Sequence, residues 1–205
     1  MLYPALENTI RTLEESTGGL SADRRALLDT IAESVDRQQG DLFLNFICTH
    51  NSRRSMLGQA WAQVAAYYHG IEGISSVSGG TEVSAFHPNS IAVLRRQGFN
   101  IEMKVPGVNP VYTLGYATDA APLKMFSKLF SDAVPAGKNF LAMMVCHEAD
   151  QACPLVPGNS GRFQLNYLDP GGSDGKPGQD AAYDDRARQV AEEMLYVFSR
   201  VKKRD

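Results

Sequence analysis

The sequence has 205 residues, of which 43% are hydrophobic, and its 20 Lys and Arg against 23 Asp and Glu give a formal net charge of −3. Such a chain can form one α/β domain with an addition, and its acidic balance argues against a nucleic-acid partner. No run approaches the roughly eighteen apolar residues of a membrane span, and the N-terminal MLYPALENTIRTLEES lacks the form of a signal peptide. We therefore expect a cytoplasmic protein with no nucleic-acid partner and no membrane association.

The sequence contains few cysteines and few histidines. The sequence contains three cysteines, Cys48, Cys146 and Cys153, and an odd count in a cytoplasmic chain argues against a structural disulfide framework. These thiols are therefore either reactive or buried. The four histidines are scattered and show no metal-ligand spacing with a cysteine pair, so we expect no metal site and no cofactor.

The first forty residues are predicted to form a helical extension. Residues 3–16 and 21–37 have helical patterns, and Ser21 is a suitable N-cap for the second helix. This segment contains no recognisable catalytic or ligand-binding motif. We divide the chain into an N-terminal helical extension, 1–40, and a main domain, 41–205, and expect the extension to pack on the domain or to serve an interface.

From residue 42 onward, predicted strands alternate with predicted helices. This alternation implies an α/β fold with a mostly parallel sheet, in which ligands bind beyond the carboxyl ends of the strands. Cys48, Cys146 and Asp169 all follow predicted strands, so one edge of the sheet could collect them. The expected elements are strands at 42–47, 74–78, 140–145 and 165–168; helices at 54–68, 88–97, 122–130 and 181–202; and paired β runs at 101–105 and 111–117.

The end of the first of these strands carries the strongest chemical signal. An apolar run ends at Cys48, five residues intervene, and Arg54-Ser55 open the next helix, which gives the spacing Cys-x5-Arg-Ser. A helix start offers unpaired N–H groups and the positive end of a dipole, and these favour a thiolate and a bound anion. Arg54 would grip two oxygens of a tetrahedral oxyanion, Ser55 would hydrogen-bond the thiolate, and Asn51 would hold the loop.

Asp169 is the candidate general acid. Because it precedes Pro170, its backbone is held extended, and its carboxyl could protonate a leaving oxygen. The alternatives are that Cys48 is a small buried residue with Arg54 as a surface charge, and that Asp169-Pro170 is an ordinary turn. The strand before Cys48, the polar residues inside the loop and the helix after it favour a nucleophile.

These motifs resemble those of a known superfamily. Residues 47–55, ICTHNSRRS, look like the phosphate loop of the low-molecular-weight protein tyrosine phosphatases, a superfamily that includes the thioredoxin-coupled arsenate reductases. Residues 78–81, SGGT, resemble the segment after the second strand there, and residues 167–170, YLDP, resemble the acid loop. The resemblance covers about residues 41–203 and implies a four-stranded parallel sheet flanked by helices, to which the N-terminal helices are an addition. It assigns oxyanion binding to Thr49, His50, Asn51, Ser52, Arg53, Arg54 and Ser55.

Residues 145–157, VCHEADQACPLVP, resemble the redox segment of the arsenate reductases, where cysteines separated by six residues precede Pro-x-x-Pro. The resemblance implies that Cys48 attacks arsenate while Asp169 protonates the departing hydroxide. Cys146 then forms a disulfide with Cys48 and releases arsenite, and Cys153 in turn attacks Cys146. A thioredoxin-like partner would reduce the resulting Cys146–Cys153 disulfide. The alternative is a pair of core thiols near a strand end.

The chain also departs from the superfamily at particular positions. Arg53 stands where some reductases have a further cysteine, and Gln59 stands where several relatives have an acid, which argues against a monovalent-cation site. His50 replaces a small residue, and we expect its side chain to face solvent.

The residues after the acid loop favour arsenate as the substrate. Tyrosine phosphatases of this superfamily usually carry an aromatic residue after Asp-Pro, whereas Gly171-Gly172 stand here and suit a small inorganic oxyanion. The leading hypothesis is therefore the reduction of arsenate to arsenite by the thiol relay. The alternative is a low-molecular-weight protein tyrosine phosphatase that hydrolyses phosphomonoesters through a Cys48 phosphoenzyme. A third hypothesis is an oxyanion-binding module that uses residues 1–40 as a partner surface.

Overall fold

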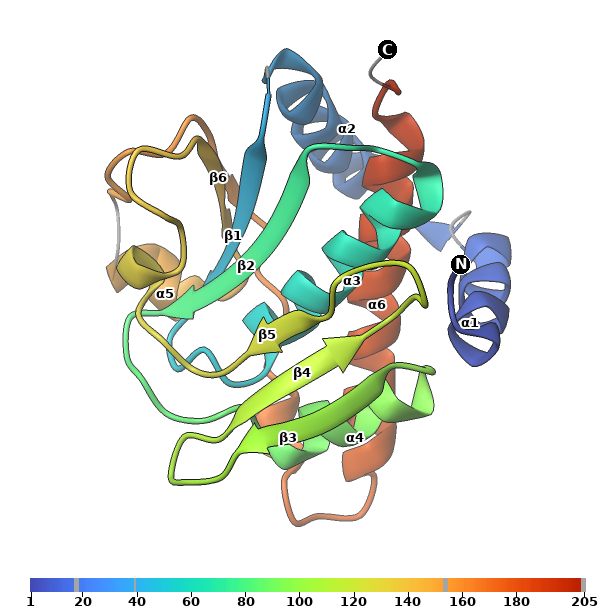
Figure 1. The fold of residues 1–205 in the computed structure, drawn as a ribbon, viewed down its shortest axis with the longest axis vertical. Coiled ribbons are helices and arrows are strands. Elements are labelled where there is room, and N and C mark those ends of the chain that lie inside the picture. The colour runs from blue at the N-terminus through green and yellow to red at the C-terminus, as the bar shows by residue number, and fades with distance from the viewer. Residues whose placement is uncertain (17–18, 39, 153–154, 204–205) are drawn as a thin grey trace.

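The structure is a computed structural model that describes residues 1–16, 19–38, 40–152 and 155–203. Within these ranges four parallel strands form the central sheet in the order β2–β1–β6–β7 (Figure 1). Continuous apolar runs are typical of parallel strands that are covered on each face, which is why β1 and β6 were recognisable from the sequence. The strands are β1 (Leu42–Cys48), β2 (Ile74–Gly80), β6 (Phe140–Met144) and β7 (Arg162–Gln164).

The last strand of the sheet lies earlier in the sequence than expected. The predicted strand at 165–168 is wrong, because β7 is the shorter segment Arg162–Gln164. Pairing ends there because Asn166 has a positive φ of 44° and its N–H, like that of Leu165, turns to Met144 O. Asp169 therefore follows β7 at the end of a connecting segment and not directly at a strand end.

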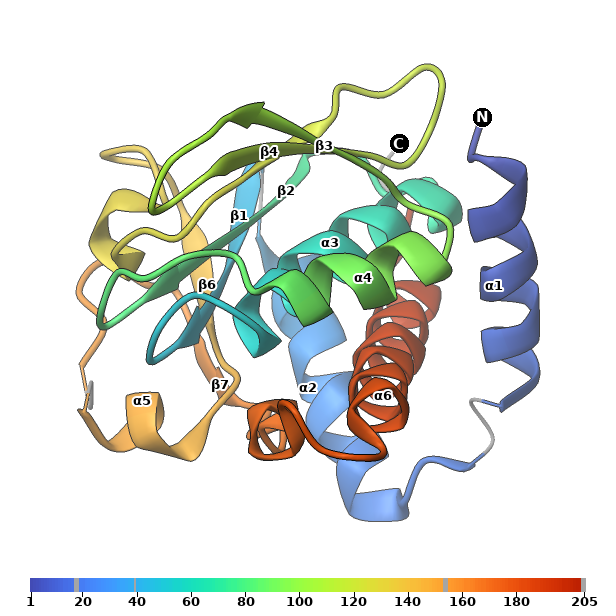
Figure 2. The ribbon, with the colours of Figure 1, turned by 90° about the horizontal axis from the view of Figure 1, so that it is seen from below.

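Helix α6 (Gln179–Arg200) is the element around which the helices gather. It contacts α1 (Pro4–Ser16), α2 (Ala22–Arg37), α3 (Arg54–His69) and α4 (Pro88–Arg96), and Figure 2 shows α3, α6 and α2 together on one side of the sheet. One face of α6 is apolar and buried, with Val190, Met194, Val197 and Phe198. In the described ranges, no helix is long and apolar enough to cross a membrane.

The N-terminal helical addition packs against the rest of the molecule. Leu6 and Ile10 of α1 are fully buried, as are Leu28, Ile31 and Val35 of α2, and all of them belong to the same hydrophobic cluster as the central strands. The predicted N-cap is also present, because the Ser21 side chain accepts a hydrogen bond from Arg24 N. The α/β fold with a four-stranded parallel sheet, flanking helices and an N-terminal helical addition is thus confirmed.

A second, antiparallel sheet is inserted between α4 and β6. In the described residues it comprises β3 (Asn100–Val105), β4 (Val111–Gly115) and β5 (Leu123–Met125), so the predicted pairing of 101–105 with 111–117 is confirmed. The predicted helix at 122–130 is wrong. Its first part pairs with β4 and buries Met125, and the 3-10 turn η2 (Phe130–Asp132) follows after an irregular stretch. Short helices α5 (His147–Ala152) and η3 (Pro170–Ser173) complete the chain.

Candidate active site

Residues 49–53 form a loop between the end of β1 and the start of α3, and the backbone of this loop is held from outside. Just before the loop, the Cys48 carbonyl accepts a hydrogen bond from Thr81 N (3.2 Å), and in the loop the Thr49 carbonyl accepts from Glu82 N (2.8 Å). The His50 carbonyl accepts from the Ser84 and Ser127 hydroxyls (2.9 Å each), and the Ser52 carbonyl accepts from His87 N (3.1 Å). Among the described residues, the amides of 49–53 make no hydrogen bond of their own. Because the carbonyls of Thr49, His50 and Ser52 are engaged outside the loop, the N–H groups are left to line its inside, which is an anion-binding arrangement.

The start of α3 adds to this arrangement. Its N-cap residue, Arg53, makes no side-chain capping hydrogen bond, so the amides of the first turn are left for a ligand. The positive end of the helix dipole also points toward the loop.

Asn51 fixes the shape of the loop. It adopts a left-handed conformation with φ of 45°, which asparagine tolerates better than most residues. Its side-chain Nδ2 donates to Ser55 Oγ (2.9 Å), and its Oδ1 accepts from Lys128 N (2.9 Å). The side chain therefore ties the loop to the helix that follows and to the segment before η2.

Glycine at the end of β2 allows the chain to approach the loop closely. A Cβ added to Gly80 would lie 2.6 Å from Thr49 O and 2.8 Å from Asn51 N. At Gly79 an added Cβ would lie 2.2 Å from Phe130 Cα. The SGGT segment therefore supports the back of the loop, and a side chain at either glycine would push the backbone away.

Cys48 lies at the base of the loop and is 4% exposed. Its Sγ is 3.1 Å from Ser55 Oγ, which in turn accepts the hydrogen bond from Asn51. The Ser55 hydroxyl can therefore donate to the sulfur, as the sequence analysis expected. The thiol and the inward N–H groups face the same small volume.

Arg54 lies beside the thiol, with its side chain 9% exposed. Its Nη2 donates to Asp169 Oδ2 (2.7 Å), and its Nη1 donates to the backbone carbonyl of Tyr167 (3.0 Å). Glu148 of α5 lies further away, at 3.7 Å from Nη1. The arginine that was predicted to hold an oxyanion is thus held by carboxylates in this structure.

Asp169 is placed over the loop by its own backbone. Its φ of −73° and ψ of 121° are extended, as expected for a residue before proline, and its Oδ1 accepts from Gly171 N (2.9 Å). The side chain is 40% exposed, so its carboxyl contacts both Arg54 and solvent. A carboxyl in this position can exchange protons with water and with a group bound in the loop.

The cavity between these groups is small, about 10 Å³, which is room for about one water molecule. Arg54 and Asp169, which form an ion pair, both line it. An oxyanion that binds in the loop must therefore separate this pair. The cavity is lined by Cys48, His50, Ser52, Arg53, Arg54 and Asp169.

The side chains of three loop residues point elsewhere. His50 is 55% exposed and lies 3.4 Å from Glu82, so it faces solvent as expected. The Ser52 hydroxyl donates to Ala85 O (2.6 Å). Thr49 points to the redox segment, since its Oγ1 is 3.6 Å from Cys146 Sγ. For these residues it is the backbone, and not the side chain, that faces the site.

Arg53 belongs to a polar cluster that the sequence analysis did not identify. Its Nη2 donates to Asp174 Oδ2 (2.5 Å) and its Nε donates to the hydroxyl of Tyr183 (2.7 Å). That hydroxyl donates to Asp174 Oδ1 (2.8 Å) and lies 3.3 Å from Nδ1 of His87. The cluster joins the loop to the segment after η3 and to the starts of α4 and α6. A signal was available, because Asp174 is the sole acid in the glycine-rich stretch 170–178.

Cys146 lies next to the loop. It follows β6, the neighbour of β1, in a register that pairs Ile47 with Met144. The thiol is fully buried, and burial raises its pKa, against a lowering effect of hydrogen bonds from Thr49 and from the amide of Ala149. Cys146 therefore lies beside the anion loop as a protonated thiol. The other cysteine of the relay, Cys153, lies outside the described residues.

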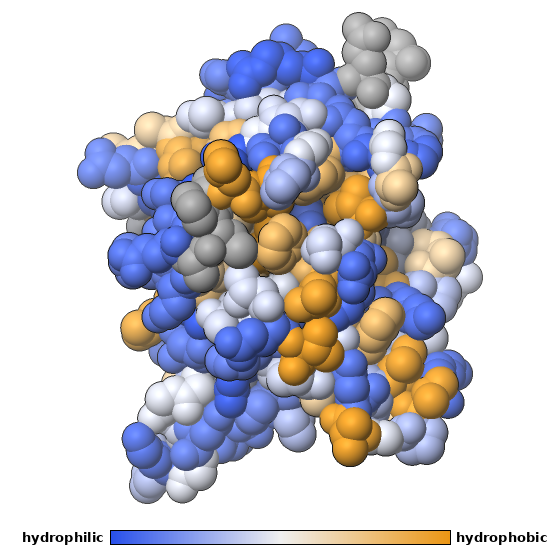
Figure 3. Space-filling view, turned by 90° about the vertical axis from the view of Figure 1, so that its left-hand side faces the viewer, coloured by the Kyte–Doolittle hydropathy of each residue, from blue (hydrophilic) through white to orange (hydrophobic). Residues whose placement is uncertain are grey.

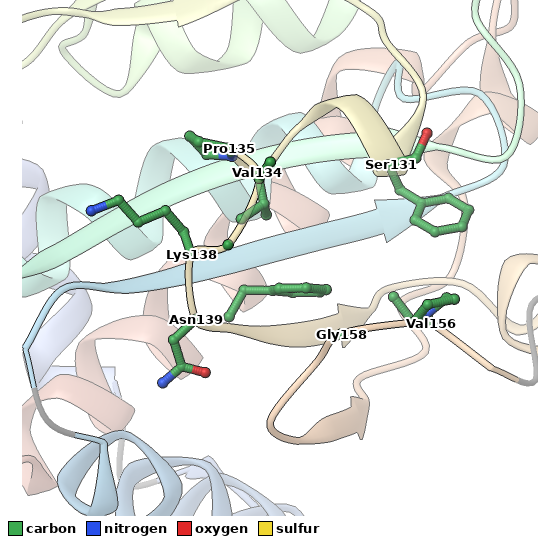
Figure 4. Close-up of a pocket in the computed structure, with 12 residues that line it drawn as sticks. Ser131, Val134, Pro135, Lys138, Asn139, Val156 and Gly158 are labelled. Carbon is green, nitrogen blue, oxygen red and sulfur yellow. The ribbon is translucent and has the colours of Figure 1, made fainter.

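A wider hollow of about 670 Å³ lies away from this site, between residues 130–140 and 156–158 (Figure 4). Apolar side chains gather on this face of the molecule (Figure 3), and Phe130, Val134, Phe140 and Val156 contribute to the lining. The described lining holds no cysteine and no carboxylate. In the part of the chain that the structure describes, no His, Cys, Asp and Glu side chains gather in a metal-binding group.

The fold and the loop define a class of protein, and comparison with known proteins agrees. A sequence model described as low molecular weight phosphotyrosine protein phosphatase matches residues 44–109. The solved low-molecular-weight protein tyrosine phosphatase of T. tengcongensis aligns with a TM-score of 0.53 at 14% identity, covering 78% of this chain and 100% of that one. The resemblance to this superfamily is thus confirmed, and the chain shares the fold of that solved protein.

The chain also matches proteins named arsenate reductase. That of Bacillus licheniformis is 23% identical over 154 residues, which are 75% of this chain and 92% of the relative. A solved arsenate reductase in a phosphate-binding state aligns with a TM-score of 0.51 at 16% identity, over 78% of this chain and 98% of that one.

Proposed function

We propose that this protein reduces arsenate to arsenite, with Cys48 as nucleophile and Cys146 and Cys153 as a thiol relay. The observation that carries the proposal is the position of Cys146, whose Sγ contacts Thr49 Oγ1 in the anion loop at 3.6 Å. A phosphatase requires the Cys48 thiol alone, whereas a reductase needs another thiol close enough to attack it. The match to curated arsenate reductases supports the same activity.

The first step joins Cys48 to arsenic. Arsenate enters the loop, its oxygens accept hydrogen bonds from the amides of 49–53, and Arg54 exchanges the Asp169 carboxylate for the oxyanion. The Cys48 thiolate attacks arsenic. Asp169, once it has taken up a proton from solvent, transfers that proton to one arsenate hydroxyl, which leaves as water. The product is a Cys48–arsenic adduct, still in the pentavalent state.

The second step moves two electrons to arsenic. The Cys146 sulfur, after losing its proton, attacks Cys48 Sγ, and the sulfur–arsenic bond breaks with its electron pair passing to arsenic. Arsenite leaves, and Cys48 and Cys146 are left as a disulfide. Cys153 then attacks Cys146 Sγ and releases the Cys48 thiolate, and a thioredoxin-like dithiol reduces the Cys146–Cys153 disulfide. Such a partner acts in a reducing compartment such as the cytoplasm.

The test is formation of arsenite with thioredoxin, thioredoxin reductase and NADPH. We expect turnover by the wild type, a single turnover at most for Cys153→Ser, and no arsenite from Cys48→Ser. If Cys146→Ser and Cys153→Ser turn over at the wild-type rate, the relay is wrong. Arsenate binding by the Cys48→Ser variant is the control for an intact loop.

The second candidate is phosphomonoester hydrolysis, which the match of residues 44–109 to the phosphatase family model favours. It uses the same loop, with phosphorus in place of arsenic, Asp169 as acid for the leaving group and water as the final acceptor. Hydrolysis of an aryl phosphate that needs Cys48 and Asp169 but is unaffected by Cys146→Ser would identify it. A kcat/KM for arsenate well above that for the aryl phosphate would reject it as the main activity.

A further inference from the structure

A residue of the N-terminal addition reaches a buried acid behind the active site. Arg24 of α2 donates from Nε to Glu193 Oε1 (2.8 Å) and from Nη2 to Oε2 (2.6 Å). Glu193 of α6 is fully buried, and Gln189 also donates to it (3.0 Å). A buried carboxylate is retained when a cation and hydrogen bonds satisfy it. The addition therefore supplies the positive charge that pairs with this buried carboxylate.

Glu193 in turn holds Tyr167, which precedes the acid Asp169 by two residues. The Tyr167 hydroxyl donates to Glu193 Oε2 (2.7 Å), and the Arg24 guanidinium lies over its ring at 5.4 Å from the centroid. Tyr167 is 2% exposed. Burial and the Glu193 charge raise the pKa of its phenol well above 10, so the hydroxyl stays a hydrogen-bond donor at any working pH.

The backbone of the same tyrosine contacts the active site. Its carbonyl oxygen accepts from Arg54 Nη1 (3.0 Å), and its N–H donates to Val145 O (3.0 Å), next to Cys146. Tyr167 thus has its side chain fixed by α2 and α6 and its peptide groups fixed against the anion loop and the redox segment. A shift of the ring would move the carbonyl that orients the Arg54 guanidinium.

We propose that Arg24, Glu193 and Tyr167 are positioning residues of the oxyanion site, and that the N-terminal addition is a working part of that site. The three residues form a brace that runs from α2 through α6 to Arg54. This inference rests on the proposed oxyanion chemistry of the loop. This role differs from the third sequence hypothesis, in which residues 1–40 form the partner surface of an oxyanion-binding module.

The test compares tyrosine-to-phenylalanine changes at two contacts of α6. Tyr167→Phe removes the hydroxyl of the brace and leaves the backbone in place. Tyr196→Phe is the matched control, because the Tyr196 hydroxyl also joins α6 to α2, through Asp29 Oδ1 (3.0 Å), but lies outside the brace. Inorganic phosphate is titrated calorimetrically into each full-length variant well below its unfolding temperature, and KM and kcat for arsenate are measured in parallel.

We expect Tyr167→Phe to weaken phosphate binding about three- to tenfold and to raise KM for arsenate by a similar factor, the range of coupling through one contact. Tyr196→Phe should bind phosphate as the wild type does. Removing Arg24 by itself would leave Glu193 buried and unpaired, so the charge pair is replaced as a unit in Arg24→Met/Glu193→Leu, which should fold and also bind phosphate weakly.

Wild-type phosphate affinity in Tyr167→Phe would overturn the proposal, whatever the double variant does. Equal weakening by Tyr196→Phe would also overturn it, because the effect would then come from general loosening of α6. Phosphate binding reports on the brace independently of arsenate reduction. A wild type that binds phosphate but forms no arsenite refutes the proposed function and leaves the brace to be decided by the titration.

Discussion

Arg54 and Asp169 face each other across the anion loop, with Arg54 Nη2 2.7 Å from Asp169 Oδ2. The cavity above Cys48, lined by both residues, is only about 10 Å³, so the proposed general acid and an incoming oxyanion would compete for the same guanidinium. Binding must therefore move Asp169 from the arginine toward the leaving oxygen. Oxyanion binding would therefore itself bring the proposed acid, Asp169, to the oxygen that it protonates.

The first prediction concerns this competition. Asp169→Asn should bind phosphate about two- to fivefold more tightly, because the competing carboxylate and its negative charge are gone and a partly exposed ion pair is worth about 1 kcal/mol or less. The same variant should lose about 10²- to 10⁴-fold in kcat, the usual contribution of a general acid. Calorimetric titration and steady-state rates separate the effects. Weaker phosphate binding by Asp169→Asn would show that the carboxylate does not compete.

The second prediction concerns the glycine behind the loop. Gly80→Ala would place a methyl group 2.6 Å from Thr49 O and 2.8 Å from Asn51 N, so the loop must shift. We expect phosphate affinity to fall at least about tenfold, since each 1.4 kcal/mol of lost binding is tenfold. Gly172→Ala is the matched control, because an added Cβ there meets nothing within 4 Å. Equal phosphate affinity in the two variants would contradict the role of Gly80.

The sequence predicted those parts of the site whose geometry is local. The strand, the thiol and the helix start lie within a continuous stretch, so the spacing from Cys48 to Arg54 already implies the loop. The last strand of the sheet was missed because Arg162–Gln164 has only three residues, one of them apolar, which is too short for a recognisable strand pattern. The segment 122–130 has apolar residues at helical spacing, but pairing of Leu123–Met125 with β4 outweighs that local preference.

The parts that could not be predicted depend on contacts between distant segments. Arg53 was assigned to the oxyanion, but its side chain is taken by Asp174 and Tyr183, residues from the far end of the chain. An added Cβ at Gly171 would lie 2.9 Å from the Arg53 guanidinium carbon, so the glycine after the acid loop accommodates this arginine. The roles of Cys153 and of the loop side chains stay predictions.

The third prediction concerns His87 and pH. Burial, followed by the Arg53 charge, lowers the pKa of His87 below 6.5, and this outweighs the opposite effect of Asp174 and Asp169. As pH falls through about 6.5 the unfolded chain takes up a proton that the folded state resists, so the free energy of unfolding declines until pH passes the folded pKa. The Nδ1 atom, which accepts from Asn89 N (3.3 Å), would also lose its capping role on protonation.

His87→Asn should reduce this acid sensitivity, because asparagine can cap α4 without titrating. Urea unfolding at pH 7.5 and 5.5 measures the loss of stability in each variant. His50→Asn is the control, since it removes a histidine from an exposed position. The explanation fails if His87→Asn loses as much stability between these pH values as His50→Asn does.

The last prediction concerns the helix that covers Cys146. Asp150 of α5 forms an ion pair with Arg162 of β7, and their side chains are 10% and 21% exposed. Arg162 Nη2 also donates to the carbonyl of Asp150 (3.0 Å). Because this largely buried contact fastens α5 to the sheet, Arg162→Met should favour local opening and expose the thiol.

In a Cys48→Ser/Cys153→Ser background, we expect native alkylation of Cys146 by iodoacetamide to be about tenfold faster with Arg162→Met, which corresponds to about 1.4 kcal/mol of easier opening. Lys138→Met is the control, because the Lys138–Asp41 pair (3.6 Å) precedes β6 but has side chains 49% and 69% exposed, and exposed pairs contribute little. Equal alkylation rates in the two variants would mean that the Asp150–Arg162 pair does not hold α5 closed, and that opening is limited by the packing of the buried thiol itself.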